Sequence, residues 1–154
     1  MFPAAAGILM ILSMLAWQQC SYWKNSTELW THALRATTDN AKAHNNLGRA
    51  LRAEGKITEA INHYNRAIRI APNNAVIYFN RATAFSMLGQ RELAIEDFNE
   101  AIRLKPSFAA AYENRAMTHL HLGNKAPGCH DLRKACEMEM CRPLEMAIRN
   151  RQCR

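Results

Sequence analysis

Apolar residues recur at helical spacing through the middle of the chain, in pairs of segments separated by a glycine. One such pair is AHNNLGRALRAEG followed by KITEAINHYNRAIRIAP. Apolar positions spaced three and four residues apart predict amphipathic helices, and the glycine can take the left-handed conformation that ends a helix. The pattern therefore predicts helical hairpins and an all-α fold.

The hairpin pattern returns at a fixed interval. Gly55, Gly89 and Gly123 recur every 34 residues. Side chains of similar size share this interval in five further sets: Gly48, Ala82 and Ala116; Ala60, Ala94 and Gly128; Ala67, Ala101 and Ala135; Tyr64, Phe98 and Leu132; Pro72 and Pro106. Small residues let two helices approach closely, larger ones fill the space between hairpins, and proline ends a helix because it has no N–H. We expect three hairpins, over 41–74, 75–108 and 109–142.

These units resemble tetratricopeptide repeats, and the resemblance covers about two thirds of the chain. It implies a right-handed superhelix of three tandem hairpins and a role in binding other proteins. The third unit departs most from the pattern. It has Pro127-Gly128 in its second helix, Met140 in place of the third proline, and His119 where the second unit has Phe85.

Stacked hairpins leave an apolar face at each end, so caps are expected. Residues 20–40 are interpreted as a linker and a degenerate half-repeat with a helix over roughly 26–37. Asn25 with Glu28 gives this helix a capping signal, and its Trp30 lies one interval before Tyr64. Residues 143–154 are interpreted as a capping helix and a basic tail, because proline suits a first helical turn and an apolar stripe follows it: Leu144, Ala147 and Ile148.

The N-terminal segment 1–19 is predicted to be an apolar helix. Met1–Trp17 contains no charged side chain, and Trp17, Tyr22 and Trp23 follow where interfacial aromatics are expected. Its length is at the lower edge of what spans a bilayer. We favour a single-pass membrane anchor over a cleaved signal peptide or an apolar helix packed on the repeats, since a basic n-region and a small-x-small cleavage site are absent.

A second resemblance concerns the segment around Trp30. Tyr22-Trp23, Ser26 and Leu29-Trp30 are similar to the junction between the last membrane helix and the repeats in membrane glycosyltransferases with tetratricopeptide repeats. The catalytic part of that family is absent here, so the resemblance implies a non-catalytic tail or an accessory component of such a system. In that family the repeats face the periplasm or lumen, and we expect the extracytoplasmic side here.

Asn46, Asn80 and Asn114 also recur at the repeat interval, on the first helix of each hairpin. In related repeat proteins this face lines a concave groove, where an asparagine ladder holds an extended peptide. A carboxamide offers donors and an acceptor that match a peptide unit. The alternative is that these asparagines bond to their own neighbours. Further residues are expected to share the groove: Asn45, Arg49, Phe79, Thr83, Glu113 and Met117.

Four cysteines lie near the C-terminus: Cys129, Cys136, Cys141 and Cys153. Their spacing matches no zinc pattern, so no metal site is expected. If the capping helix turns back near Cys141, a Cys129–Cys153 disulfide would staple the cap and Cys136–Cys141 would close the turn. This pairing requires an oxidising compartment. Free, partly buried thiols are the favoured alternative.

The net charge of +7 favours anionic partners, although charge of this size also keeps a small helical domain in solution. No aromatic–basic stripe suggests nucleic acid, and no P-loop, dinucleotide fingerprint or nucleophile elbow suggests catalysis or a cofactor. The sequence therefore predicts a membrane-tethered, non-enzymatic scaffold for a protein or peptide ligand. Self-association through the repeats is a further alternative.

Overall fold

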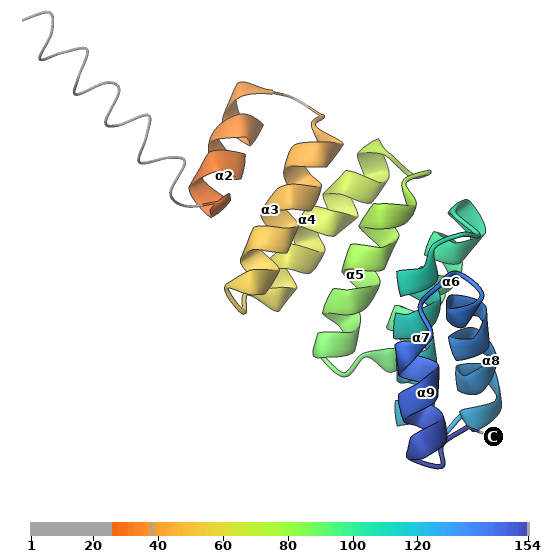
Figure 1. The fold of residues 1–154 in the computed structure, drawn as a ribbon. Coiled ribbons are helices and arrows are strands. Elements are labelled where there is room, and N and C mark those ends of the chain that lie inside the picture. The colour runs from red at the N-terminus through yellow and green to blue at the C-terminus, as the bar shows by residue number, and fades with distance from the viewer. Residues whose placement is uncertain (1–25, 38, 154) are drawn as a thin grey trace, which may run out of the picture.

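The computed structural model describes residues 26–37 and 39–153, and this part of the chain contains eight helices and no strand (Figure 1). The helices are α2 Ser26–Ala36, α3 Ala41–Ala53, α4 Ile57–Ile70, α5 Ala75–Met87, α6 Arg91–Leu104, α7 Ala109–His121, α8 Lys125–Cys136 and α9 Arg142–Arg149. The prediction of an all-α fold is confirmed.

Three antiparallel hairpins, α3–α4, α5–α6 and α7–α8, follow one another in a superhelical stack (Figure 1). The turn inside each hairpin is made by the recurring glycine. Gly55, Gly89 and Gly123 have φ angles of 79°, 74° and 78°. A side chain at these angles would be strained, so the glycines fix where each first helix ends.

The core of each hairpin is built around one large side chain on its second helix. Tyr64, Phe98 and Leu132 are all fully buried. Gly48 shows how closely the helices approach, because a Cβ added there would lie 2.6 Å from a ring carbon of Tyr64. The second and third hairpins carry Ala82 and Ala116 at this position, opposite smaller side chains.

The N-terminal cap is α2, which packs on α3 as the second helix of a half-repeat would. Trp30 and Leu34 lie against the buried core of the first hairpin. The expected apolar helix over 1–19, with its interfacial aromatics, lies outside the described residues, as does Asn25. None of the helices from α2 to α9 is long and apolar enough to cross a bilayer.

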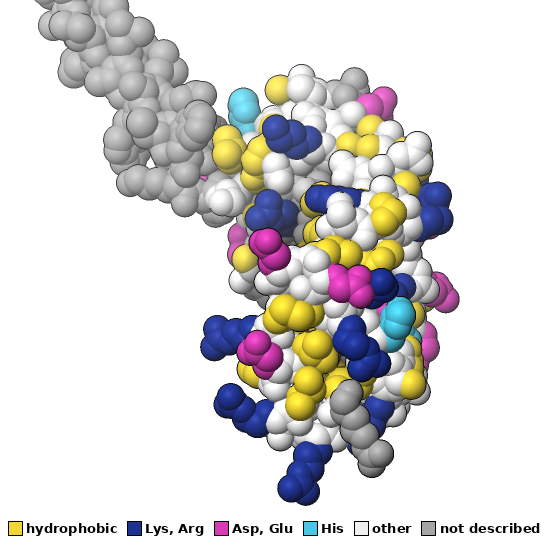
Figure 2. Space-filling view, turned by 45° about the vertical axis from the view of Figure 1, so that its right-hand side comes forward, with side chains coloured by type: hydrophobic (Ala, Val, Ile, Leu, Met, Phe, Trp, Pro, Cys, Tyr) yellow, Lys and Arg dark blue, Asp and Glu magenta, His cyan; other side chains and the backbone are white. Residues whose placement is uncertain are grey.

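The C-terminal cap is α9, which turns back and packs along α8 (Figure 1). Ala147 is buried, whereas Met146 and Ile148 are about half exposed. Figure 2 shows apolar side chains gathered over this end of the molecule, with Lys and Arg around them. The cap therefore covers the last hairpin but leaves part of its own apolar surface open.

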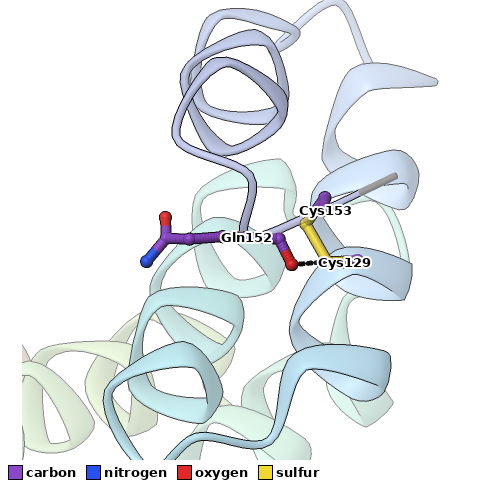
Figure 3. Close-up of a disulfide and its surroundings, with 3 residues drawn as sticks. All are labelled: Cys129, Gln152 and Cys153. Atoms are coloured by element: carbon purple, nitrogen blue, oxygen red, sulfur yellow. Dashed lines mark hydrogen bonds between the residues drawn. A yellow bond between two sulfur atoms is a disulfide. The ribbon is translucent and has the colours of Figure 1, made fainter.

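Two disulfides fasten this cap. Cys129 of α8 is joined to Cys153, with their Cα atoms 5.6 Å apart (Figure 3). Cys136 is joined to Cys141. The structure therefore contains disulfides here and not the free thiols that the sequence favoured. The return of the chain after α9 brings Cys153 back to α8. Cys129 Sγ also lies 3.5 Å from the carbonyl oxygen of Gln152, a contact without a proton since this sulfur is oxidised.

Candidate functional site

The first helices of the hairpins, α3, α5 and α7, lie in sequence along one side of the stack and contact one another. Between α5 and α7 this side contains a hollow of about 320 Å³, which we call the central pocket. Its walls combine two methionines with hydroxyl, amide and basic groups: Thr83, Ser86, Met87, Arg91, Asn114, Met117, Thr118 and His121. An adaptable apolar wall beside hydrogen-bonding groups suits a peptide side chain.

The three recurring asparagines have different surroundings. Asn80 is only 5% exposed, and its amide donates to Asn45 Oδ1 at 2.8 Å. Asn114 lines the central pocket and donates to the carbonyl oxygen of Ala110 at 2.8 Å. Asn46 lines a different hollow, near α2. Two of the three thus bond to neighbouring groups, and a role for the ladder in holding a ligand stays a prediction.

The other predicted groove residues are also distributed unevenly. Thr83 and Met117 line the central pocket, although the Thr83 hydroxyl donates to the carbonyl oxygen of Phe79. The Phe79 ring packs between Phe98 and Phe108, with centroids 5.9 and 4.9 Å away, so it belongs mainly to the core. Arg49 lies in the hollow near α2.

Several residues of the central pocket were not predicted. Ser86 and Met87 lie three and four residues beyond Thr83, and His121 lies four beyond Met117. Residues at these spacings share one face of a helix. Helical spacing from the predicted residues was therefore a signal that could have found them.

The hollow near α2, which we call the N-terminal pocket, measures about 440 Å³ and lies between α2 and α3. It is lined by Ser26, Trp30, Asn46, Arg49, Ala50, Arg52 and Ala53. The α3 residues form one stripe, because they are spaced three and four residues apart. Two arginines, Arg49 and Arg52, thus line a single concavity.

The helices that carry the central pocket are held by what we call arginine clamps. Arg81 of α5 donates two 2.7 Å hydrogen bonds to the carboxylate of Asp97 on α6 and a third to Asn65 on α4. Arg115 of α7 makes the same contacts with Asp131 on α8 and Asn99 on α6. Bidentate pairs of this kind fix geometry as well as charge. Each clamp sets the position of a first helix relative to both of its neighbours.

Two protein-family models match the chain. A TPR repeat model matches residues 48–89, and a tetratricopeptide repeat model matches residues 75–108. Together, these matches cover residues 48–108, which are similar to tetratricopeptide repeats. Repeats of this family are generally interaction modules without catalytic activity. The matches begin at residue 48, so the resemblance of the Tyr22–Trp30 segment to membrane glycosyltransferases receives no support from them.

Solved structures of repeat proteins share this fold. The chain is similar to the crystal structure of MamA (TM-score 0.74, 16% identity, 87% of this chain and 81% of MamA covered), which shows the fold alone. It is also similar to the Arabidopsis OM64 TPR domain (TM-score 0.69, 25% identity, 71% of this chain and 92% of that domain covered). A third similar structure is the first TPR of Spaghetti (RPAP3) bound to the HSP90 peptide SRMEEVD (TM-score 0.65, 25% identity, 73% of this chain and 96% of that chain covered). No curated protein matches the chain in sequence.

Proposed function

We propose that this chain is a non-catalytic interaction scaffold that binds an extended peptide segment along α3, α5 and α7, with one peptide side chain in the central pocket. The observation that carries the proposal is the pocket itself, open to solvent between two first helices. A similar repeat domain is solved with a bound HSP90 peptide, which supports a peptide as the ligand.

The chemistry of the central pocket fits a peptide without demanding one sequence. Met87 and Met117 are 56% and 40% exposed, and flexible thioether side chains adapt to apolar groups of different shape. The Asn114 side-chain oxygen accepts no hydrogen bond from another described residue, so it is available to a peptide N–H. Peptide backbone contacts would thus give affinity, and the methionines would select apolar side chains.

We further propose that residues 1–19 tether the scaffold to a membrane as a single-pass anchor, with the repeats on the extracytoplasmic side. The two disulfides support this side, because such bonds persist in oxidising compartments. An accessory role in a membrane glycosyltransferase system is the alternative. Protease digestion of sealed membrane vesicles whose outer surface is the extracytoplasmic side tests this orientation. Repeats that are digested only after the vesicles are permeabilised would contradict it.

A peptide library selected on the full chain tests the groove. The selected peptides should lose at least about tenfold in affinity for Met117→Glu, which places a charge on the apolar wall of the pocket. Leu93→Glu is the matched control, because Leu93 is 43% exposed on α6 and lines none of the described pockets. Equal binding by both variants and the unaltered chain would overturn the groove proposal.

A further inference from the structure

The N-terminal pocket carries positive charge that the rest of the described structure does not balance. Among the described residues, its lining includes Arg49 and Arg52 and no acidic side chain. Neither arginine forms a salt bridge within residues 26–37 and 39–153. The sequence of residues 1–25 also contains no Asp or Glu that would supply a counter-charge from that side.

Arg52 is the more constrained of the two cations. It lies one helical turn beyond Gly48, against which the Tyr64 ring packs, and its Nε is buried without a hydrogen-bond partner among the described residues. The Tyr64 hydroxyl is buried in the same way. Burial raises the pKa of Tyr64, and the neighbouring Arg52 acts in the opposite direction through its positive charge and through a polar contact between the two side chains. A buried donor on a cation is costly when it has no acceptor.

The acidic residue nearest in sequence is already engaged. Glu54 follows the last residue of α3 and accepts hydrogen bonds from Thr27 and from Lys56, the latter at 2.9 Å. Its carboxylate is therefore committed to α2 and to the hairpin turn. This leaves a space of about 440 Å³ that is lined by both arginines and to which no acidic side chain of the described residues is assigned.

We propose that the N-terminal pocket is a binding site for an oxyanion, a carboxylate or a phosphate group, held between the guanidinium groups of Arg49 and Arg52. A guanidinium presents its N–H donors in a planar fork that matches both kinds of oxyanion. The Asn46 amide adds a neutral donor on the same stripe of α3, and the Trp30 ring gives the ligand an apolar wall. This site lies between the half-repeat and the first hairpin, apart from the central pocket.

The test is a titration of the full chain in micelles of an uncharged detergent, followed by NMR of the arginine Nε–Hε groups. One arm adds inorganic phosphate at constant ionic strength, with chloride as the balancing ion. A second arm adds a capped peptide of glutamates, with the matching glutamine peptide for comparison. We expect saturable shifts of the Arg49 and Arg52 signals. Saturation by either probe supports the site, and the tighter probe identifies the source of the oxyanion.

Arg49→Gln should weaken binding of the tighter probe by about tenfold or more, since each charge-assisted hydrogen bond contributes on that scale. This variant is expected to fold, because Arg49 is exposed. Arg69→Gln removes the same charge from the exposed last turn of α4, outside the pocket, and should leave binding unchanged. Met117→Glu should also retain it, which separates this site from the peptide groove. Loss of binding in Arg69→Gln equal to that in Arg49→Gln, or no saturable shift with either probe, would overturn the proposal.

Discussion

The hairpins α3–α4 and α5–α6 have the same backbone arrangement but differ in what joins their helices. In α5–α6, Arg81 binds Asp97 within the hairpin and Asn65 of the preceding one. One repeat interval earlier, the positions of Arg81 and Asp97 are occupied by Leu47 and His63. The first hairpin therefore has no arginine clamp at this place.

Other contacts occupy that place in the first hairpin. Leu47 is 4% exposed and lies in the cluster against which Trp30 and Leu34 of α2 pack. His63 instead pairs with His44, their Nδ1 atoms 3.0 Å apart. The repeat backbone thus accepts either a charged clamp or an apolar contact with a histidine pair. The apolar version occurs where a half-repeat, and not a complete hairpin, is the neighbour.

The largest effect should come from breaking a clamp. Asp97→Ala leaves the guanidinium of Arg81, whose side chain is 21% exposed, with Asn65 as its remaining polar partner. Removing one partner of a largely buried ion pair costs about 3 kcal/mol or more, because the other charge stays desolvated. Urea unfolding followed by far-ultraviolet circular dichroism measures this loss.

His63→Ala is the corresponding change in the first hairpin. It removes one neutral hydrogen bond and leaves no buried charge, so a loss of about 1 kcal/mol is expected. Comparable losses for the two variants would mean that the clamp holds its hairpin no more firmly than the histidine pair holds the first one.

An effect smaller than that of Asp97→Ala is expected where the two helices of the first hairpin approach most closely. Gly48→Ala would place its Cβ 2.6 Å from the fully buried Tyr64 ring, so the ring or the helix must move. Overpacking of this kind costs about 1–3 kcal/mol, partly offset by the better helix propensity of alanine. The midpoint of thermal unfolding reports the change.

Tyr64→Leu in the Gly48→Ala background tests the cause, because the third hairpin combines Ala116 with Leu132. The smaller side chain should recover part of the stability lost in Gly48→Ala. Strictly additive losses would show that contact with the ring is not the source of the effect.

Much of the fold was predictable because each repeat encodes it locally. The left-handed turns at Gly55, Gly89 and Gly123 follow from the glycine interval, and the helical periodicity gives the hairpins on either side. The clamps recur at the same interval, so their signal was present in the sequence as well. Their partners, however, lie 16 residues apart on different helices, and only the packing shows that Arg81 reaches Asp97 and Asn65 together.

The candidate site was less predictable, because periodicity identifies the residues that share a helix face but not how deeply each of them is buried. Asn80 recurs as a ligand-binding residue would, yet it is buried and bonded to Asn45, 35 residues away. Conversely, the unpaired charge of Arg52 depends on which acidic residues are already bound, and that information exists only in three dimensions. The resemblance thus predicts a groove along the first helices, whereas side-chain partners decide which of its residues are available to a ligand.

The smallest expected effect is a pH dependence of the free energy of unfolding that comes from the first hairpin. Burial lowers the pKa of both His44 and His63 below the ordinary value of 6.5, and the charge of Arg66 acts in the same direction; for His63 the His44 charge also lowers it and Glu59 opposes. Below about pH 6.5 these two histidines therefore bind more protons in the unfolded chain than in the folded one. The free energy of unfolding should therefore have its full value above this pH and should decrease as the pH falls through it.

Urea titrations between about pH 8 and pH 5 measure this dependence before the carboxylates titrate appreciably. Burial also lowers the pKa of His119, so the comparison is made in a His119→Phe background, with the residue type that the second hairpin has at this position. Adding His44→Tyr and His63→Asn removes the pair and supplies the tyrosine found at residues 78 and 112. The slope of stability against pH should then become shallower. An unchanged slope would place the acid sensitivity outside the first hairpin and remove the histidine pair as its cause.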